Sequence, residues 1–216
     1  QKQPFPFDLT TLQRDAYTHF HYSPKQTLDI AQSLYEQALI SYPRTSSQKL
    51  PDKLGFKAII NGLWKQPVYK NMCEILLKKP GLKPNEGPKS DSAHPAIYPT
   101  GNAPKALNNY QRNIYDLITK RFLATFADPA KRLATKITID VGGEKFSAEG
   151  ATTLEPGWMD FYKPYTRLKE QQLPEAKKGD EVRPYNIGML DKETQPPKRY
   201  TPASILKECE KLGLGT

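Results

Sequence analysis

The chain is organised around one stretch, Ile40-Ser41-Tyr42-Pro43-Arg44-Thr45-Ser46-Ser47-Gln48. It follows a helix-like apolar pattern and interrupts it with β-branched residues, a proline and hydroxyl side chains. A residue before proline is pushed towards extended geometry, so Tyr42 is predicted to be extended. Because residues i and i+2 of an extended chain share a face, the phenol of Tyr42 and the guanidinium of Arg44 are expected to point the same way.

This pairing favours chemistry on a phosphodiester. Arg44 offers a planar fork of donors that suits a phosphate, and the hydroxyls of Thr45, Ser46 and Ser47 follow it directly. A phenol beside a phosphate-holding arginine is what nucleophilic attack on a phosphodiester requires. An isolated Tyr-Pro-Arg is more often a half-buried tyrosine in a turn, so the interpretation depends on the rest of the chain.

Composition narrows the class of protein. The 216 residues have room for one large domain or two small ones, and 32 Lys+Arg against 23 Asp+Glu give a net charge of +9. Such a balance fits a nucleic acid, an anionic membrane surface or simple solubility. The sequence contains no apolar run of about 18 residues that would span a membrane, and Gln1–Pro6 is not a secretory signal. Cys73 and Cys209 are far apart, which favours reduced core thiols in an intracellular protein.

The first part of the chain, residues 1–128, is predicted to be helical. Asp8 can cap a first helix, and Ser23-Pro24 is a typical start for a second, in which Leu28, Ala31, Leu34, Tyr35 and Ala38 recur at helical spacing. Two helices, a short turn and a strand-like Leu39-Ile40-Ser41 resemble a winged helix-turn-helix, although many helical hairpins share this pattern. Further helices are expected at about 54–63, at 67–79 with Val68, Met72, Ile75 and Leu76 inward, and at 106–127.

Residues 80–105 are expected to form a long, structured loop, because they include six prolines and three glycines. Loops of this length are uncommon without a function. His94 lies inside it, in the run His94-Pro95-Ala96-Ile97-Tyr98-Pro99-Thr100. A lone loop histidine is usually exposed and idle, but it can also carry a positive charge beside a phosphate.

After Asp128-Pro129 the apolar period changes from helical to alternating. Ile137, Ile139 and Val141 alternate up to a Gly142-Gly143 hairpin turn, and another strand is expected at about 181–190. Trp158, Phe161 and Tyr162 could stack on bases or form a core. The expected fold is an α+β multidomain fragment: a helical, winged-helix-like domain (1–128), a β-rich segment (129–194), and the start of a further helical domain (195–216).

Several of these motifs occur in the order found in type IA DNA topoisomerases. The helix beginning at Asp8, the run Leu39-Ile40-Ser41-Tyr42-Pro43-Arg44-Thr45 and the His94 loop together resemble the active-site domain of that family. The segment from Gln195 through Lys198-Arg199 to Gly213-Leu214-Gly215-Thr216 resembles the start of its later DNA-binding helical domain. The ending is similar to the topoisomerase III branch, and the overall sequence to archaeal members.

The resemblance implies a toroidal enzyme in which Tyr42 attacks one DNA strand and becomes joined to its 5′ phosphate. By this likeness Arg44 holds the scissile phosphate, His94, Thr45 and Ser46 contact DNA near it, and Lys198 and Arg199 belong to a later DNA-binding domain. Residues 129–194 would be part of the arch. The implied partners are single-stranded DNA and the parent enzyme's other domains, and the implied cofactor is Mg²⁺, with its ligands outside this segment.

Two departures from the family pattern limit what this chain is expected to do by itself. Ser46 stands where many relatives have an aspartate, and the acidic metal-binding domain that precedes this segment in the family is absent. A free phenol, with a pKa of about 10, is ionised to roughly one part in a thousand at neutral pH. The acidic residues of the His94 loop, Glu86 and Asp91, are too few for a Mg²⁺ site without substrate phosphates. The isolated segment is therefore expected to bind DNA without cleaving it.

Two other interpretations of the sequence remain open. A winged-helix DNA-binding module without chemistry would explain the charge and the helical hairpin, but not Tyr42-Pro43-Arg44 or the His94 loop. An RNA- or single-strand-binding scaffold would use Trp158 and its aromatic neighbours.

Overall fold

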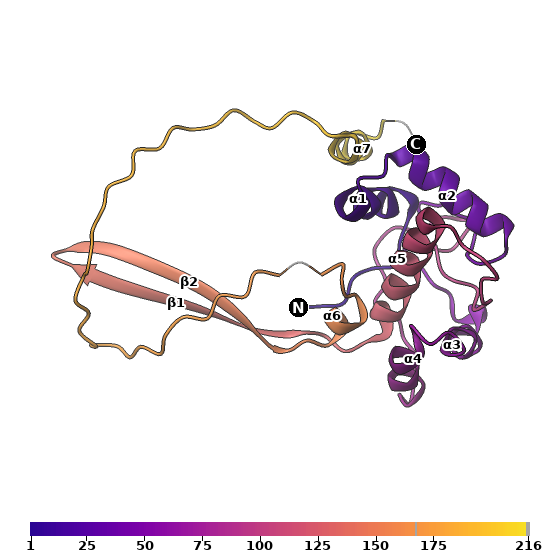
Figure 1. Ribbon diagram of the computed structural model, residues 1–216, viewed down its shortest axis with the longest axis horizontal. Coiled ribbons are helices and arrows are strands. Elements are labelled where there is room, and N and C mark those ends of the chain that lie inside the picture. The colour runs from indigo at the N-terminus through magenta and orange to yellow at the C-terminus, as the bar shows by residue number, and fades with distance from the viewer. Residues whose placement is uncertain (167, 215–216) are drawn as a thin grey trace.

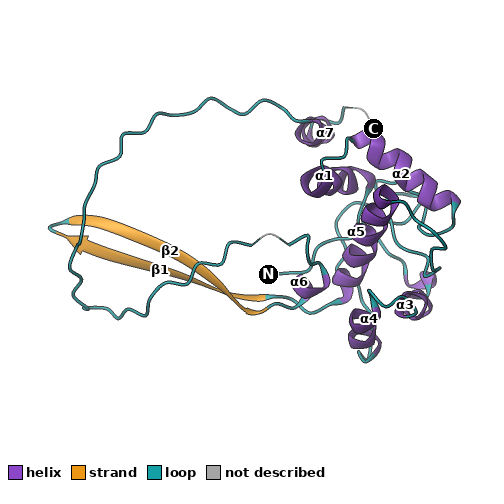
Figure 2. Cartoon of the chain, viewed as in Figure 1, coloured by secondary structure: helices purple, strands orange, loops and turns teal. Residues whose placement is uncertain are grey.

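The computed structural model describes residues 1–166 and 168–214. A helical body carries a long two-stranded hairpin that projects away from it, and an extended segment runs past the tip of the hairpin and returns to the body (Figures 1 and 2). The elements, in order, are α1 (Leu9–Phe20), α2 (Pro24–Glu36), the 3₁₀ turn η1 (Asp52–Leu54), α3 (Phe56–Trp64), α4 (Lys70–Leu77), α5 (Asn109–Phe126), β1 (Lys131–Val141), β2 (Glu144–Glu155), α6 (Trp158–Phe161) and α7 (Pro202–Lys211). The α+β class expected from the sequence is confirmed.

Helix α5 is the centre of the helical body. It contacts α1, α2, α4 and α6. The apolar residues that recur at every fourth position of this helix are buried, with Ile114 and Ile118 at 0% exposure, Phe122 at 1% and Phe126 at 3%. The helix begins at Asn109, three residues later than expected, because Asn108 forms a capping box with Gln111. Its apolar face therefore organises the core around which the other helices pack.

Helices α1 and α2 form the hairpin that the sequence predicts. Asp8 and Ser23 cap their N-termini through side-chain oxygens. The two helices meet at His21, whose φ of 58° lets the chain reverse direction within a few residues. Ile40, after α2, and Phe7, before α1, pair with Pro99 and Ile97 through isolated bridges. The helical hairpin is present, and the comparison with a winged helix stays a prediction.

The projecting hairpin follows the expected pattern and is longer than predicted. Strands β1 and β2 pair antiparallel from Val141 opposite Glu144 down to Lys131 opposite Glu155. Gly142 and Gly143 have φ values of 61° and 91°, as a tight two-residue turn of this kind requires.

The expected strand at 181–190 is not formed. Residues 172–201 lie in extended, mostly exposed chain, and Ala151 makes an isolated bridge with Gln171. Val182, Ile187 and Leu190 are 52%, 59% and 78% exposed. Their pattern suits a strand, but among the described residues this segment pairs with neither strand of the hairpin, although Val182 and Ile187 border a hollow shared with its tip. The prediction of a β-rich segment up to about 190 is therefore correct only as far as Glu155.

The buried face of helix α4 differs from the face that the sequence predicted. Val68 and Ile75 were expected to face inward, yet they are 68% and 53% exposed. Leu76 is buried as predicted, and Tyr69 and Cys73 are buried in place of Val68 and Ile75. The helix begins only at Lys70, so Val68 precedes it in a turn. Packing against α3 and α5 selected the face with Cys73.

The aromatic residues after the hairpin are core residues. Trp158, Phe161 and Tyr162 are 8%, 7% and 3% exposed, where α6 packs on α5. The Tyr162 hydroxyl donates to Asp15 at 2.9 Å, and Arg121 lies over its ring. These rings are not available to stack on bases, so the alternative of a scaffold that uses them for nucleic acid is wrong.

Helix α7 is capped by Thr201, begins at Pro202 and is followed by Gly213 at φ 68°. The last residues of the motif that ends the chain, Gly215 and Thr216, lie outside the described residues. The helix packs on α1, and Glu210 forms an ion pair with Lys89. Among the described helices, none is long and apolar enough to cross a membrane.

Asp8 connects several of these elements. Its removal is expected to lower the free energy of unfolding more than the removal of a helix cap alone would. Its Oδ1 accepts from the backbone N–H of Thr11 at 2.7 Å, and its Oδ2 accepts from Gln48 Nε2 at 2.9 Å and Lys89 Nζ at 3.3 Å. Asp8→Ala should lower the free energy of unfolding in urea by about 2–3 kcal/mol, because a buried amide and an ammonium lose their acceptor along with the cap.

The matched control is Ser23→Ala, which removes a solvent-exposed cap from α2 and should cost about 1 kcal/mol. Equal losses for the two variants would show that the buried hydrogen bonds of Asp8 add nothing.

Candidate active site

The site is built where two segments far apart in the sequence pair with each other. The N–H of Ser41 donates to the carbonyl of Tyr98 at 2.9 Å, and the N–H of Tyr98 donates to Ser41 Oγ at 3.0 Å. The N–H of Thr100 donates to Leu39 O at 3.0 Å, and that of Ala96 to Lys49 O at 2.8 Å. This pairing places the His94 loop beside the stretch that carries Tyr42.

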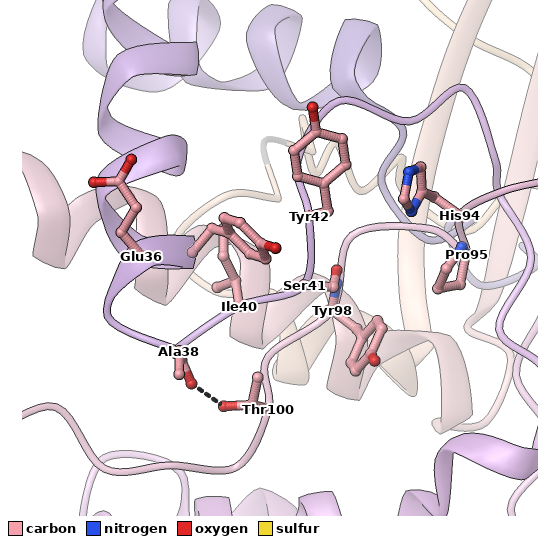
Figure 3. A pocket seen from close by; sticks show the side chains of 10 residues that line it. Glu36, Ala38, Ile40, Ser41, Tyr42, His94, Pro95, Tyr98 and Thr100 are labelled. Atoms are coloured by element: carbon pink, nitrogen blue, oxygen red, sulfur yellow. Dashed lines mark hydrogen bonds between the residues drawn. The ribbon is translucent and has the colours of Figure 1, made fainter.

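Tyr42 lies between two aromatic rings. Its ring centroid is 4.8 Å from that of His94, with the planes inclined at 50°, and 5.3 Å from that of Tyr35 in an edge-on contact. Figure 3 shows the Tyr42 hydroxyl at the outer edge of the site, away from the paired segments. The hydroxyl makes no hydrogen bond to any described residue, so it is available to an incoming group.

Below Tyr42 is an open hollow of about 590 Å³ (Figure 3). Its lining comes from the end of α2 and from both paired segments, and consists of Tyr35, Glu36, Ala38, Ile40, Ser41, Tyr42, His94, Pro95, Tyr98 and Thr100. Burial raises the pKa of Tyr98 above its ordinary value. Its phenol therefore remains a neutral donor at physiological pH.

Arg44 is exposed and uncommitted. Its side chain makes no ion pair or hydrogen bond with the described part of the chain. Arg121, by contrast, is bound to Asp15 and to the carbonyl of Phe5. Arg44 therefore keeps its donors for a ligand, two residues along the chain from Tyr42.

The hydroxyl residues after Arg44 divide into two kinds. Thr45 and Ser47 are 4% and 1% exposed. The Thr45 hydroxyl accepts from Ser47 N at 3.0 Å and donates to the His94 carbonyl at 3.4 Å. Ser46 is exposed, and its hydroxyl donates weakly to Asp91 Oδ2 at 3.5 Å. Thr45 thus holds the two segments together, while Ser46 faces solvent.

Asp91 fixes the turn that presents His94. Its Oδ1 accepts from the N–H of Ala93 at 2.8 Å and of His94 at 3.2 Å. These backbone hydrogen bonds, that of Ala93 first, hold the pKa of the Asp91 carboxyl below its usual value. A carboxylate engaged in this way positions the histidine backbone and leaves the exposed His94 ring against Tyr42.

The acidic residues of the loop do not form a Mg²⁺ site. Glu86 accepts from Leu50 N at 2.6 Å and lies 3.7 Å from Lys49, and Asp91 is engaged as described. Nowhere in residues 1–166 and 168–214 do three or more His, Cys, Asp or Glu side chains gather as metal ligands would. The donor set of this chain therefore does not fit the magnesium ion that the family resemblance implies.

Two of the expected site residues lie elsewhere, and two others were missed. Lys198 and Arg199 are exposed in the extended chain that precedes α7, away from the hollow. Tyr35 was predicted to be core from its helical spacing, yet it is 41% exposed against Tyr42. Tyr98 was also missed. Its position four residues after His94, in a run that pairs with Ser41, could have indicated it.

Comparison with known proteins identifies the family. The sequence profile of the DNA topoisomerase family matches residues 1–216. The chain is 50% identical over 215 residues to DNA topoisomerase 1 of Pyrococcus horikoshii, covering 99% of this chain and 31% of that protein. It is 51% identical to the Methanocaldococcus jannaschii DNA topoisomerase 1 over 98% of this chain and 28% of that protein, and 34% identical to human DNA topoisomerase 3-alpha over 99% of this chain and 21% of that protein.

A solved structure supports the same assignment. The full-length topoisomerase I of Thermotoga maritima superposes with a TM-score of 0.76 at 30% identity, over 99% of this chain and 36% of that one. The chain thus spans between 21% and 36% of the length of these relatives. The chain therefore belongs to the type IA DNA topoisomerase family.

Proposed function

We propose that this chain carries the nucleophile of a type IA DNA topoisomerase, which cleaves and rejoins one DNA strand to change DNA topology. The observation that carries the proposal is the placement of Tyr42. Its hydroxyl is free at the edge of an open hollow, and its ring lies 4.8 Å from that of His94. A winged-helix module without chemistry would not need a half-exposed tyrosine held between two rings in this way.

In the proposed reaction, Oη of Tyr42 attacks the phosphorus of a DNA phosphodiester. The bond from phosphorus to the 3′ oxygen breaks, the phenolic proton leaves, and the 3′ oxygen takes up a proton. The products are a 5′-phosphotyrosine link and a free 3′-hydroxyl. Attack by that hydroxyl on the phosphotyrosine reverses each change and rejoins the strand.

The other residues of the site support this step. Arg44 is free to fork onto the non-bridging oxygens of the scissile phosphate. His94 is exposed beside Tyr42, and Ser46 is exposed beside Asp91 of the His94 loop, so both can contact neighbouring parts of the strand. Thr45 would act through its hydrogen bond to the His94 carbonyl, which holds the two segments in register.

The remaining parts of the proposal concern the whole protein. Mg²⁺ would be held by residues other than those described here, and it would neutralise charge on the phosphate and leaving group. The helical residues 1–128 would form a winged-helix-like tyrosine domain, and residues 129–194 part of an arch. Residues 195–216 would begin a DNA-binding domain with Lys198 and Arg199. The substrate would be single-stranded DNA at the nucleoid.

Tyr42→Phe tests the nucleophile. In a full-length enzyme that contains this chain, the substitution should abolish the covalent protein–DNA adduct while leaving the melting temperature and DNA affinity unchanged, because the hydroxyl has no partner in the described structure. Adduct is measured by denaturing gel with a strand labelled at its 3′ end.

Tyr110→Phe, on the exposed start of α5, is the control and should cleave normally. Undiminished adduct in Tyr42→Phe would assign the nucleophile to another tyrosine.

Arg44→Ala and Arg44→Lys test the phosphate contact. At saturating DNA, the alanine variant should cleave about 10²-fold more slowly, as when a single transition-state donor is removed. The lysine variant should fall between it and wild type, because it keeps the charge and loses the fork. Cleavage is followed as a single-turnover rate.

Arg112→Ala, which removes one exposed positive charge from α5, should change the cleavage rate little. Equal rates for Arg44→Ala and wild type would rule out the role of Arg44.

The 216-residue chain itself should bind single-stranded DNA without cleaving it. Its net charge of +9 predicts binding that weakens steeply with salt. The logarithm of the binding constant should fall with the logarithm of the salt concentration, with a slope of roughly −0.7 for each phosphate neutralised. Fluorescence anisotropy between low and physiological salt measures this slope. Lys198→Ala with Arg199→Ala should reduce its magnitude by roughly 0.7 for each phosphate that the variant no longer neutralises.

The same preparation, incubated with Mg²⁺ and labelled strand, should form no adduct. Adduct that disappears in Tyr42→Phe would show that the chain carries its own activating groups, with Asp91 and Glu86 as the first residues to test.

A further inference from the structure

The hollow beside Tyr42 has a lining that suits a base and not a phosphate. Of the described residues that line it, none is Lys or Arg, and the one carboxylate is Glu36. The rest are aromatic rings, small apolar residues and hydroxyls. An anion would meet Glu36 without a fixed cation, whereas a planar, uncharged base would find π-faces. A neighbouring hollow differs, because its lining carries charges of both signs: Lys49 and Lys53 beside Glu86 and Asp91.

Aromatic side chains stand on several sides of the hollow. Tyr35, in the last turn of α2, is part of the lining. Tyr42 and His94 lie together, and Tyr98 lies across from them (Figure 3). The hydroxyls of Tyr35 and Tyr98 have no hydrogen-bond partner among the described residues, so they can bind the edge of a base. The volume of about 590 Å³ lies in the range of small-molecule pockets, roughly 300–1,000 Å³.

The proposed chemistry restricts which nucleotide can reach this hollow. After cleavage, the nucleotide directly 3′ of the cut is joined through its 5′ phosphate to Oη of Tyr42. Its sugar and base must therefore lie within the reach of one sugar-phosphate unit from that oxygen. The nucleotide 5′ of the cut carries the released 3′-hydroxyl and has no covalent link to this chain.

We infer that the hollow is the binding site for the base of the first nucleotide 3′ of the cut, with Tyr35 and Tyr98 as the residues that bind it. This inference rests on the proposed function of Tyr42. Stacking on aromatic side chains tolerates every base, because each has a π-face. The site would hold the covalently linked end in place while the strand is open, and so keep it aligned for rejoining.

A base-deletion experiment in a full-length enzyme containing this chain tests the inference. The substrates are single strands of one sequence with a single dominant cut, labelled at the 3′ end. One strand carries an abasic site at the first nucleotide 3′ of the cut. Another carries the abasic site at the third nucleotide 3′ of the cut. The remaining strand is intact. Covalent adduct is measured at DNA concentrations below saturation.

Removing the first base should lower adduct formation about tenfold, in keeping with the loss of one base–aromatic stack. Removing the third base should change it less than twofold. Equal sensitivity at the two positions, or none at either, would overturn the inference.

Variants connect the effect to the residues. Tyr35→Leu and Tyr98→Leu should lower adduct formation on the intact strand. When the first base is also removed, adduct formation by each leucine variant should fall by a smaller factor than it does for the wild-type enzyme. Tyr35→Phe and Tyr98→Phe keep the rings and should retain most of the activity, whether or not the leucine variants fold. Tyr185→Leu, a fully exposed tyrosine outside the hollow, is the matched control.

Fully additive losses from the leucine substitution and the base deletion would show that the tyrosines do not bind that base. Tyr42→Phe keeps the two proposals apart. If it still forms adduct, the proposed function fails. If it does not, and the first base is without effect, the function stands and the base site falls.

Discussion

The candidate site depends on a reciprocal pair of hydrogen bonds between Ser41 and Tyr98. The N–H of Ser41 donates to the Tyr98 carbonyl, and the Ser41 hydroxyl accepts from the Tyr98 N–H, across 57 residues of sequence. The bonds of Thr100 to Leu39 and of Ala96 to Lys49 extend this contact in both directions. Because the two segments are held at several points, the phenol of Tyr42 and the ring of His94 meet in one geometry. Loops that carry functional groups need such fixing to a rigid scaffold.

The same segments are tied to the helical body through a buried carboxylate. Asp8 is 1% exposed, caps α1 and accepts from Gln48, at the end of the stretch that carries Tyr42. It also accepts from Lys89, which pairs with Glu210 of α7. Burial lowers the pKa of Lys89, and the contacts with Glu210 and Asp8 outweigh it, so the pKa lies above its usual value. The ammonium therefore stays charged and joins α7 to the site segment.

The two large features of the molecule differ in how they are stabilised. The helical body has a continuous core around α5, whereas the β1–β2 hairpin pairs only with itself and with the chain near Gln171, as far as the described residues show. The chain beyond it exposes large apolar side chains, among them Tyr185 and Met189. The site lies on the well-packed body, so its geometry does not depend on the position of the hairpin (Figure 1).

The amino-acid sequence by itself determined the features that depend on near neighbours. The caps at Asp8, Ser23 and Thr201, the buried stripe of α5 and the Gly142-Gly143 turn each follow from residues within one or two turns of chain. The family motifs also identified Tyr42 and His94 as one site. Tertiary structure decided the rest. Tyr35 fits the helical stripe of α2, yet it faces an open hollow because the chain leaves the helix just beyond it. Val68 and Ile75 match an inward face, but α3 and α5 pack on the side of Cys73 instead. The strand pattern at 181–190 remains extended chain, because a strand forms only where another strand satisfies its backbone hydrogen bonds.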